Sequence, residues 1–155
     1  MKYINYLNHV PQVPEELLDP VDAIIAASCE KMLVKDFATF EYKTVNPALD
    51  KWVHDTFKVK CYAKYQVIHH GIPIHKDRPA FPGDRRMAFN YLLQLGGNNV
   101  KTTVYADDKT TILQQEIIPL KTWHSLVVEE WHGVDGLTPG LPRVALTVTP
   151  ILPPP

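Results

Sequence analysis

Histidine and aspartate stand two residues apart in the segment GIPIHKDRPAFPGDRR, which covers residues 71–86. Side chains two apart in an extended strand point to the same side, about 7 Å apart along the chain. His75 and Asp77 can therefore bring an imidazole and a carboxylate to one metal ion. Pairs of this kind also arise by chance in loops, so the prediction of a metal site depends on a third ligand.

His132 and His124 are the two candidates for that third ligand. His132 lies 55 residues after Asp77, which leaves room for four or five strands, and Arg143 follows 11 residues later. Two histidines and one carboxylate on one face of a metal form the facial triad of non-haem Fe(II) sites. His124 is the competing ligand, but it would place Arg143 nineteen residues away. We therefore prefer His75, Asp77 and His132 as the triad.

Arg143 opens the apolar segment RVALTVTPI, residues 143–151. A guanidinium stays charged and presents a rigid fork of donors, so it binds a carboxylate through paired hydrogen bonds. The positions that a facial triad leaves open on the metal admit a bidentate 2-oxo acid and dioxygen. An arginine at this position can therefore hold the far carboxylate of a 2-oxo acid such as 2-oxoglutarate.

Eight short segments that could position these side chains follow residue 58. They are rich in Val, Ile, Thr and Tyr and are separated by Gly, Pro, Asn and Asp, which is typical of strands in a sandwich or barrel. They cover residues 58–68, 71–75, 86–95, 98–106, 110–118, 122–130, 132–134 and 143–151. Eight strands after two helices favour a mainly β, α+β fold: a jelly roll with the helices packed on one sheet.

Two helices are predicted before the strands. Asp19 is predicted as the N-cap and Pro20 as the first residue of a helix that continues over residues 21–37. One apolar stripe runs along it, formed by Val21, Ile25, Cys29, Met32 and Leu33. A shorter helix is predicted from about Leu49 to Phe57, directly after Asn46 and Pro47.

The length of 155 residues and the hydrophobic content of 45% predict one domain over residues 1–155. Within it we expect helical support over residues 14–57, the β core over residues 58–150 and a proline-rich tail over residues 151–155. These boundaries follow the change from helical to strand-like texture at residue 58 and the closing run of prolines.

At these residues the sequence resembles the Fe(II)- and 2-oxoglutarate-dependent oxygenases, and within them the prolyl-hydroxylase-like group. The likeness is carried by HKD at 75–77, NYLLQLGG at 90–97, WHGV at 131–134 and PRVALTV at 142–148. It implies a double-stranded β-helix, a cupin-like jelly roll, in which His75, Asp77 and His132 bind Fe(II). It also implies that Arg143 binds 2-oxoglutarate, with Tyr91, Thr147 and Tyr65 as further contacts in the same pocket.

The resemblance implies a dioxygenase that hydroxylates an aliphatic C–H bond and converts 2-oxoglutarate and O2 to succinate and CO2. Peptidyl proline is the first-choice substrate, and free amino acids or other small molecules come next. In the related halogenases a small residue replaces the carboxylate, so Asp77 favours hydroxylation. The alternative is a non-enzymatic cupin-like module that binds a metal or a small acid, in which Arg143 has no particular role.

Composition and charge exclude several other classes of function. The net charge of −1 and the pI near 6.6 argue against a nucleic-acid partner held by general phosphate contacts. No apolar run has the length of a signal peptide core or a membrane span. The two cysteines, Cys29 and Cys61, provide neither a disulfide framework nor a structural zinc site. We therefore expect a cytoplasmic protein.

Overall fold

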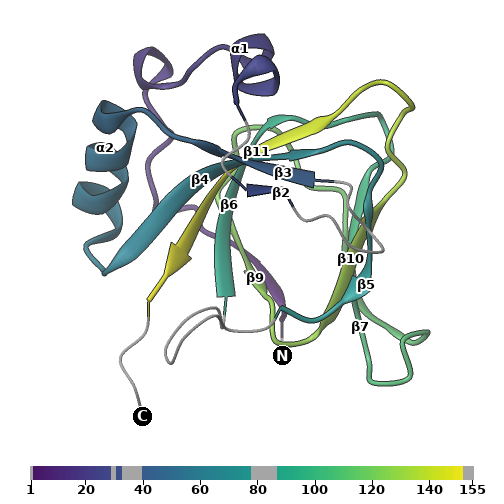
Figure 1. Ribbon diagram of the computed structural model, residues 1–155. Coiled ribbons are helices and arrows are strands. Elements are labelled where there is room, and N and C mark those ends of the chain that lie inside the picture. Colours follow the sequence, from purple (N-terminus) through teal and green to yellow (C-terminus); the bar gives the residue numbers. More distant parts are fainter. Residues whose placement is uncertain (1, 29–30, 33–39, 78–86, 152–155) are drawn as a thin grey trace.

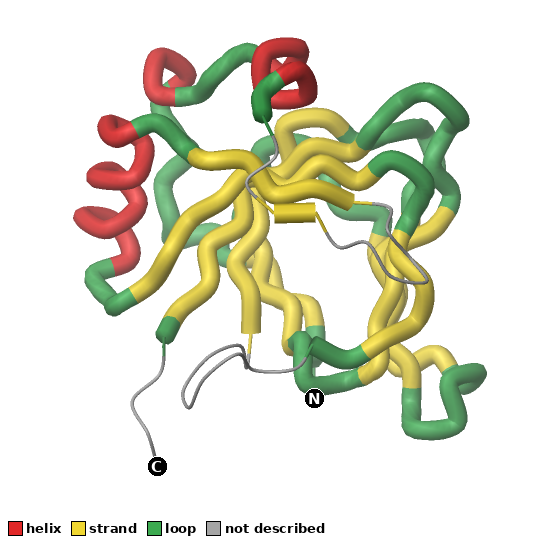
Figure 2. Tube along the Cα trace, viewed as in Figure 1, coloured by secondary structure: helices red, strands yellow, loops and turns green. Residues whose placement is uncertain are grey.

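Two antiparallel sheets and two short α-helices make up the computed structural model, which describes residues 2–28, 31–32, 40–77 and 87–151 (Figures 1 and 2). The larger sheet has seven strands in the order β1 (Ile4–Tyr6), β9 (His124–Val127), β6 (Met87–Gln94), β11 (Arg143–Pro150), β4 (Cys61–Ile68), β3 (Phe40–Thr44) and β2 (Lys31–Met32). The smaller sheet has four strands in the order β5 (Ile72–His75), β10 (Trp131–Asp135), β7 (Lys101–Tyr105) and β8 (Ile112–Glu116). All eight strands predicted from the sequence are present.

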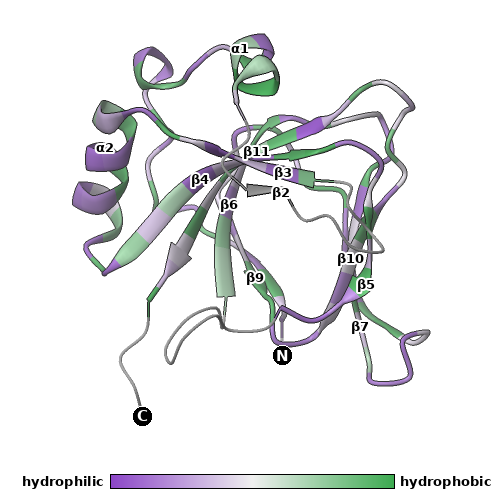
Figure 3. Cartoon of the chain, viewed as in Figure 1, coloured by the Kyte–Doolittle hydropathy of each residue, from purple (hydrophilic) through white to green (hydrophobic). Residues whose placement is uncertain are grey.

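One layer of the core lies between the larger sheet and the N-terminal region. A 3-10 turn η1 (Glu15–Leu17), helix α1 (Val21–Ala26) and helix α2 (Pro47–Phe57) cover this face of the sheet. Leu49 and Val53 of α2 are fully buried there, whereas the hydrophilic residues Lys51, His54 and Asp55 of the same helix are exposed. Figure 3 shows hydrophilic and hydrophobic residues alternating along α2. Every second residue of the central strand β11 packs into the same layer: Val144, Leu146 and Val148.

The second layer of the core lies between the two sheets. It combines Val104 of the smaller sheet with Leu92, Leu126 and Ala145 of the larger sheet, and Ile4 closes it from β1. Residues 143, 145 and 147 of β11 face this layer because side chains alternate along a strand. The central strand β11 is therefore buried on both faces, which explains why it carries apolar side chains on both sides.

Helix α1 is much shorter than the predicted helix over residues 21–37. It ends at Ala26, and the backbone of Ala27 is extended, with φ −64° and ψ 155°. The ammonium group of the buried Lys43 donates to the carbonyl oxygens of Ile25 and Ala27, so a side chain satisfies acceptors that a longer helix would have used. Residues 29–30 and 33–37 of the predicted helix lie outside the described residues.

The start of α1 also differs from the prediction. Pro20 is the N-cap, and Asp19 makes no cap hydrogen bond. The Asp19 carboxylate instead accepts hydrogen bonds from the Tyr65 hydroxyl and the Asn46 amide. Asn46 is the N-cap of α2, and its side chain accepts from the backbone N–H of Leu49, as the Asn-Pro start of that helix predicts.

The sequence patterns missed the strands β1, β2 and β3. Strand β3 alternates aromatic and charged residues in FEYKT, a period-two pattern that could have been recognised. Strands β1 and β2 have only three and two residues, too few for a periodic signal. In the described part of the chain, no helix has the length and apolar character needed to cross a membrane.

Candidate metal centre and anion pocket

His75 and His132 are brought together by direct pairing of two strands of the smaller sheet. His75 is the last residue of β5, His132 is the second residue of β10, and the two face each other in the antiparallel register. Their rings lie side by side, with centroids 4.3 Å apart. Asp77 follows β5, and its backbone N–H donates to the carbonyl oxygen of Val128 at 3.0 Å. This hydrogen bond holds the carboxylate beside the two rings.

One carboxylate oxygen is shared between both imidazoles. Oδ1 of Asp77 lies 3.1 Å from Nε2 of His75 and 3.3 Å from Nε2 of His132. One ligand atom from each of the three residues falls within 4.8 Å of the others. Neighbouring ligand atoms around an octahedral ion, bound at about 2.1 Å, lie about 3 Å apart. The carboxylate-to-imidazole distances therefore have the spacing that a metal ion requires.

The tautomers of both histidines also suit a metal. Nδ1 of His75 lies 2.8 Å from the carbonyl oxygen of Pro73, and Nδ1 of His132 lies 2.7 Å from that of Glu130. A carbonyl oxygen only accepts, so each Nδ1 carries a proton and each Nε2 faces Asp77; with a metal ion bound, the lone pair of each Nε2 would point at the ion. Two imidazole lone pairs and a carboxylate then converge, a donor set that a cation satisfies. His75, Asp77 and His132 could hold a metal ion.

Arg143 lies between the two sheets and is almost completely buried, with 3% of its surface exposed. Nη1 donates to the Thr102 hydroxyl at 3.3 Å, while Nε has no hydrogen-bond partner. Burial lowers the pKa of the guanidinium to about 10. Among the described residues no carboxylate pairs with Arg143. A buried cation without a counterion is costly, so this arrangement suits the binding of an external anion.

Strand β7 shows that Arg143 and His132 face the same layer. Val104 of β7 is directly opposite His132, and Thr102, which accepts from Arg143, is two residues earlier on the same face. Directly paired residues, and residues two apart on one strand, point to the same side of a sheet. The guanidinium of Arg143 and the imidazole of His132 therefore both lie in the layer between the two sheets.

Thr147 shares the inner face of the larger sheet with Arg143, in agreement with their spacing of four residues. Its hydroxyl donates to Oδ1 of Asn90 at 2.9 Å, and Asn90 is paired with His124 on the next strand. The residues His124, Asn90 and Thr147 thus form a polar row across three neighbouring strands. His124 lies in this row and is not part of the His75, Asp77 and His132 group.

Tyr65 and Tyr91 lie on the opposite face of the larger sheet from Arg143, contrary to the prediction that they contact the same ligand. Both belong to the helix-covered layer. The Tyr91 ring packs against Trp123 at 4.9 Å. The Tyr65 hydroxyl donates to the Asp19 carboxylate at 3.0 Å, and burial raises the pKa of this phenol. The sheet backbone separates both side chains from Arg143.

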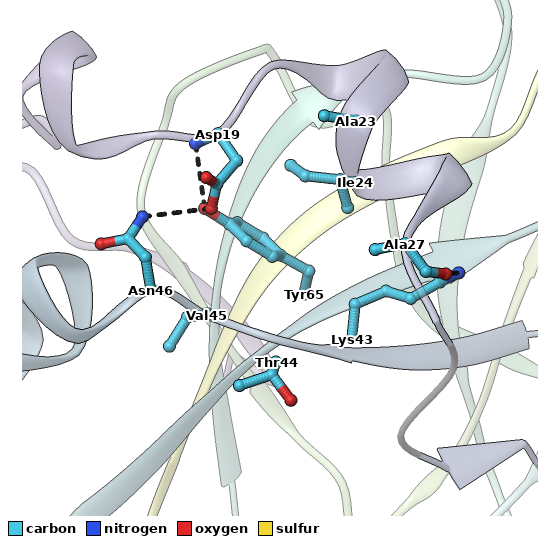
Figure 4. A pocket seen from close by; sticks show the side chains of 9 residues that line it. All are labelled: Asp19, Ala23, Ile24, Ala27, Lys43, Thr44, Val45, Asn46 and Tyr65. Carbon is cyan, nitrogen blue, oxygen red and sulfur yellow. Dashed lines mark hydrogen bonds between the residues drawn. The ribbon is translucent and has the colours of Figure 1, made fainter.

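Figure 4 shows Tyr65 at a cavity of about 250 Å³ between α1 and the larger sheet. The lining residues are Asp19, Ala23, Ile24, Ala27, Lys43, Thr44, Val45, Asn46 and Tyr65. Tyr65 and Asn46 both donate to the Asp19 carboxylate, and Lys43 donates to backbone carbonyl oxygens. These polar groups connect α1 and α2 to the sheet, so the cavity has a structural role.

Thr102 and Asn90 are polar residues of the inner layer that sequence patterns did not single out. Thr102 is one of two adjacent threonines in the strand KTTVY, and only the fold reveals which of them faces Arg143. Asn90 precedes Tyr91 in a strand of otherwise apolar texture, MAFNYLLQ. A polar residue in such a strand is the signal that could have identified it.

Comparisons with known proteins do not name a family for this chain. No family model matches it, and no curated protein is significantly similar to it.

Proposed function

We propose that the protein is an Fe(II)- and 2-oxoglutarate-dependent dioxygenase that hydroxylates an aliphatic C–H bond. Peptidyl proline is the first-choice substrate, by the resemblance of the sequence to the prolyl-hydroxylase-like group. The two antiparallel sheets are compatible with the double-stranded β-helix, a jelly roll, that this proposal requires. The converging side chains of His75, Asp77 and His132 support the iron site.

The single observation that carries the proposal is the position of Arg143. Its guanidinium is buried in the layer that His132 also faces, and it has no counterion among the described residues. A protein that only binds a metal does not need such a group. An enzyme that positions 2-oxoglutarate on the metal needs a cation for the second carboxylate. Unlike lysine, arginine can hold that carboxylate through two parallel hydrogen bonds.

Different side chains would bind the metal, orient the co-substrate and exclude water. His75, Asp77 and His132 would hold the iron, which when bound supplies the oxidation chemistry coupled to loss of CO2 from 2-oxoglutarate. Arg143 and Thr102 orient the co-substrate from the inner end of the pocket. The apolar layer around Val104 and Leu92 excludes water from the region between the sheets.

Succinate formation tests the proposal. Wild-type protein with Fe(II), O2 and 2-oxoglutarate should release succinate, and a hydroxylated peptide should accumulate when a suitable substrate is added. His75→Ala and His132→Ala should abolish succinate release, whereas His70→Ala, at an exposed histidine, should leave it intact. Metal binding without affinity for 2-oxoglutarate would instead support a cupin-like binding module.

A further inference from the structure

The segment from His75 to Asp77 carries two of the three candidate metal ligands at the end of an edge strand. Among the described strands, β5 pairs with β10 alone, and the register of this pair shifts between His132 and Val134. Beyond the end of β5, the N–H of Asp77 donates to the carbonyl oxygen of Val128. The end of an edge strand opens more readily than the centre of a sheet, so the spacing of the ligands depends on every further contact that holds this segment.

Lys76 and Trp131 make such a contact on the outer side of the smaller sheet. Lys76 stands between His75 and Asp77, and Trp131 directly precedes His132. Side chains alternate along an extended chain, so Lys76 and Trp131 project away from the layer that His132 faces. The ammonium nitrogen of Lys76 lies 5.0 Å from the centre of the Trp131 ring, inside the range of about 6 Å for a cation–π interaction. This contact connects the residue between the first two candidate ligands with the residue before the third.

The turn between β7 and β8 adds two further contacts to this cluster. The ammonium nitrogen of Lys109 lies 4.0 Å from the centre of the Trp131 ring. A carboxylate oxygen of Asp107 lies 3.8 Å from the ammonium nitrogen of Lys76. The turn has a defined shape, because the carboxylate of Asp108 accepts hydrogen bonds from two of its backbone N–H groups. The cluster therefore joins the end of β5, the start of β10 and the β7–β8 turn.

We propose that Lys76 and Trp131 are positioning residues of the metal centre, which hold the ligand-bearing end of β5 against β10 through their cation–π contact. Lys109 covers the same ring from the β7–β8 turn. Neither Lys76 nor Trp131 belongs to the group of candidate ligands, so both act through the spacing of the three residues that do. This inference rests on the metal site of the proposed function, but not on its co-substrate or its reaction.

The charge of Lys76 and its contact with Trp131 have opposite effects on metal affinity. An ammonium group near the site repels a divalent cation, so removal of the charge alone should strengthen metal binding. Removal of the contact should weaken metal binding, because the end of β5 is then held less firmly against β10. The strength of an exposed cation–π interaction corresponds to about a two- to fivefold change in affinity. The sign of the change therefore distinguishes a positioning role from a simple effect of charge.

Titration of the metal-free protein with Co(II) tests this inference, because the visible absorption bands of bound Co(II) report the arrangement of its ligands. Lys76→Met removes the ammonium group and should bind Co(II) about two- to fivefold more weakly than wild type, with shifted bands. Lys76→Arg keeps a cation over the ring and should behave as wild type. Lys101→Met is the matched control, because it removes a lysine charge at the far end of β7, opposite Asp135, and should bind Co(II) like wild type.

Each outcome separates this inference from the proposed function. Equal or tighter Co(II) binding in Lys76→Met with unchanged bands, whether or not its stability in urea falls, overturns the positioning role and leaves the dioxygenase intact. Weaker binding that Lys76→Arg does not restore overturns the cation–π contact as its cause. Weaker binding that Lys76→Arg restores, in a protein that releases no succinate, supports the positioning role and contradicts the dioxygenase. No Co(II) binding by wild type overturns both.

Discussion

At the scale of single residues, Asp77 connects the two histidines of the candidate metal centre. Oδ1 of Asp77 lies within 3.3 Å of Nε2 of both rings. A neutral amide keeps the shape of this side chain and removes the charge. Loss of a residue that only hydrogen-bonds to a metal ligand lowers the metal affinity about 10- to 100-fold. Loss of a direct ligand should lower the metal affinity at least as much.

Asp77→Asn should therefore weaken Fe(II) binding by about 100-fold or more. Anaerobic calorimetry with Fe(II) measures this change. Asp135→Asn, at the exposed end of β10, is the matched control and should bind Fe(II) like wild type. Unchanged affinity in Asp77→Asn would show that the carboxylate is not a ligand.

Arg143 is expected to lower the stability of the fold, although it increases the affinity for 2-oxoglutarate. Replacement by methionine keeps much of the side-chain volume. It removes the buried guanidinium, whose Nε atom has no hydrogen-bond partner. Buried polar groups without partners cost about 1 to 3 kcal/mol. Arg143→Met should therefore raise the free energy of unfolding by about that amount, measured in urea, and lose affinity for 2-oxoglutarate. A variant that is less stable than wild type would indicate that the guanidinium holds the two sheets together.

At the scale of secondary structure, Gly133 allows β5 and β10 to approach closely beside the candidate metal centre. A Cβ atom at Gly133 would lie 2.8 Å from the carbonyl oxygen of Ile72, a distance shorter than Cβ atoms show to other heavy atoms in protein structures. The clash is with backbone of β5, so relief requires that β5 move away from β10. His75, at the end of β5, would move with it.

Gly133→Ala should lower the Fe(II) affinity by about tenfold or more, although residue 133 touches no metal ligand atom. Gly140→Asn is the control, because a Cβ there meets no atom within 4 Å and asparagine tolerates its left-handed backbone. Equal Fe(II) affinity in both variants would contradict the role of Gly133 in strand spacing.

Helix α2 depends on its N-cap. Asn46 accepts from the N–H of Leu49 and donates from Nδ2 to the carbonyl oxygen of Leu17. Asn46→Ala should lower the free energy of unfolding by about 1 to 2 kcal/mol, measured in urea. Lys51→Ala removes an exposed ion pair with Asp55 on the same helix and should cost less than about 0.5 kcal/mol. A smaller loss in Asn46→Ala than in Lys51→Ala would rule out the cap.

The predictability of these elements differs for a physical reason. The N-cap, the proline at the first position and the apolar stripe of helix α2 all indicate the same helix, and its predicted range is close to the observed one. The stripe after Pro20 is equally periodic, yet α1 ends after six residues. The buried ammonium of Lys43, which follows the end of α1 by 17 residues, takes the carbonyl oxygens there. Local patterns do not contain a contact of that kind.

At the scale of the whole molecule, the larger sheet is covered on both faces, and this limits what strand alternation predicts. Alternation establishes that Arg143 and Thr147 share a face. It does not establish which face of β4 or β6 meets the smaller sheet, because helices cover one side and strands the other. Tyr65 and Tyr91 were therefore predicted for the pocket and lie in the helix-covered layer.

The convergence of His75, Asp77 and His132 was predictable because it depends on few long-range facts. Two of the residues are two apart in sequence, and the third requires only that β10 pair with β5. Thr102 and Asn90 required the full register between strands, which no short motif contains. The arginines at positions 78, 85 and 86 lie outside the described residues.

An anaerobic titration with Fe(II) followed by 2-oxoglutarate tests whether the three metal ligands and Arg143 act on one bound co-substrate. A dioxygenase should show a weak visible charge-transfer band that saturates at one 2-oxoglutarate per protein. The band should be absent in His132→Ala and should require a much higher 2-oxoglutarate concentration in Arg143→Met. Fe(II) binding with no band at any 2-oxoglutarate concentration would rule out the proposed dioxygenase.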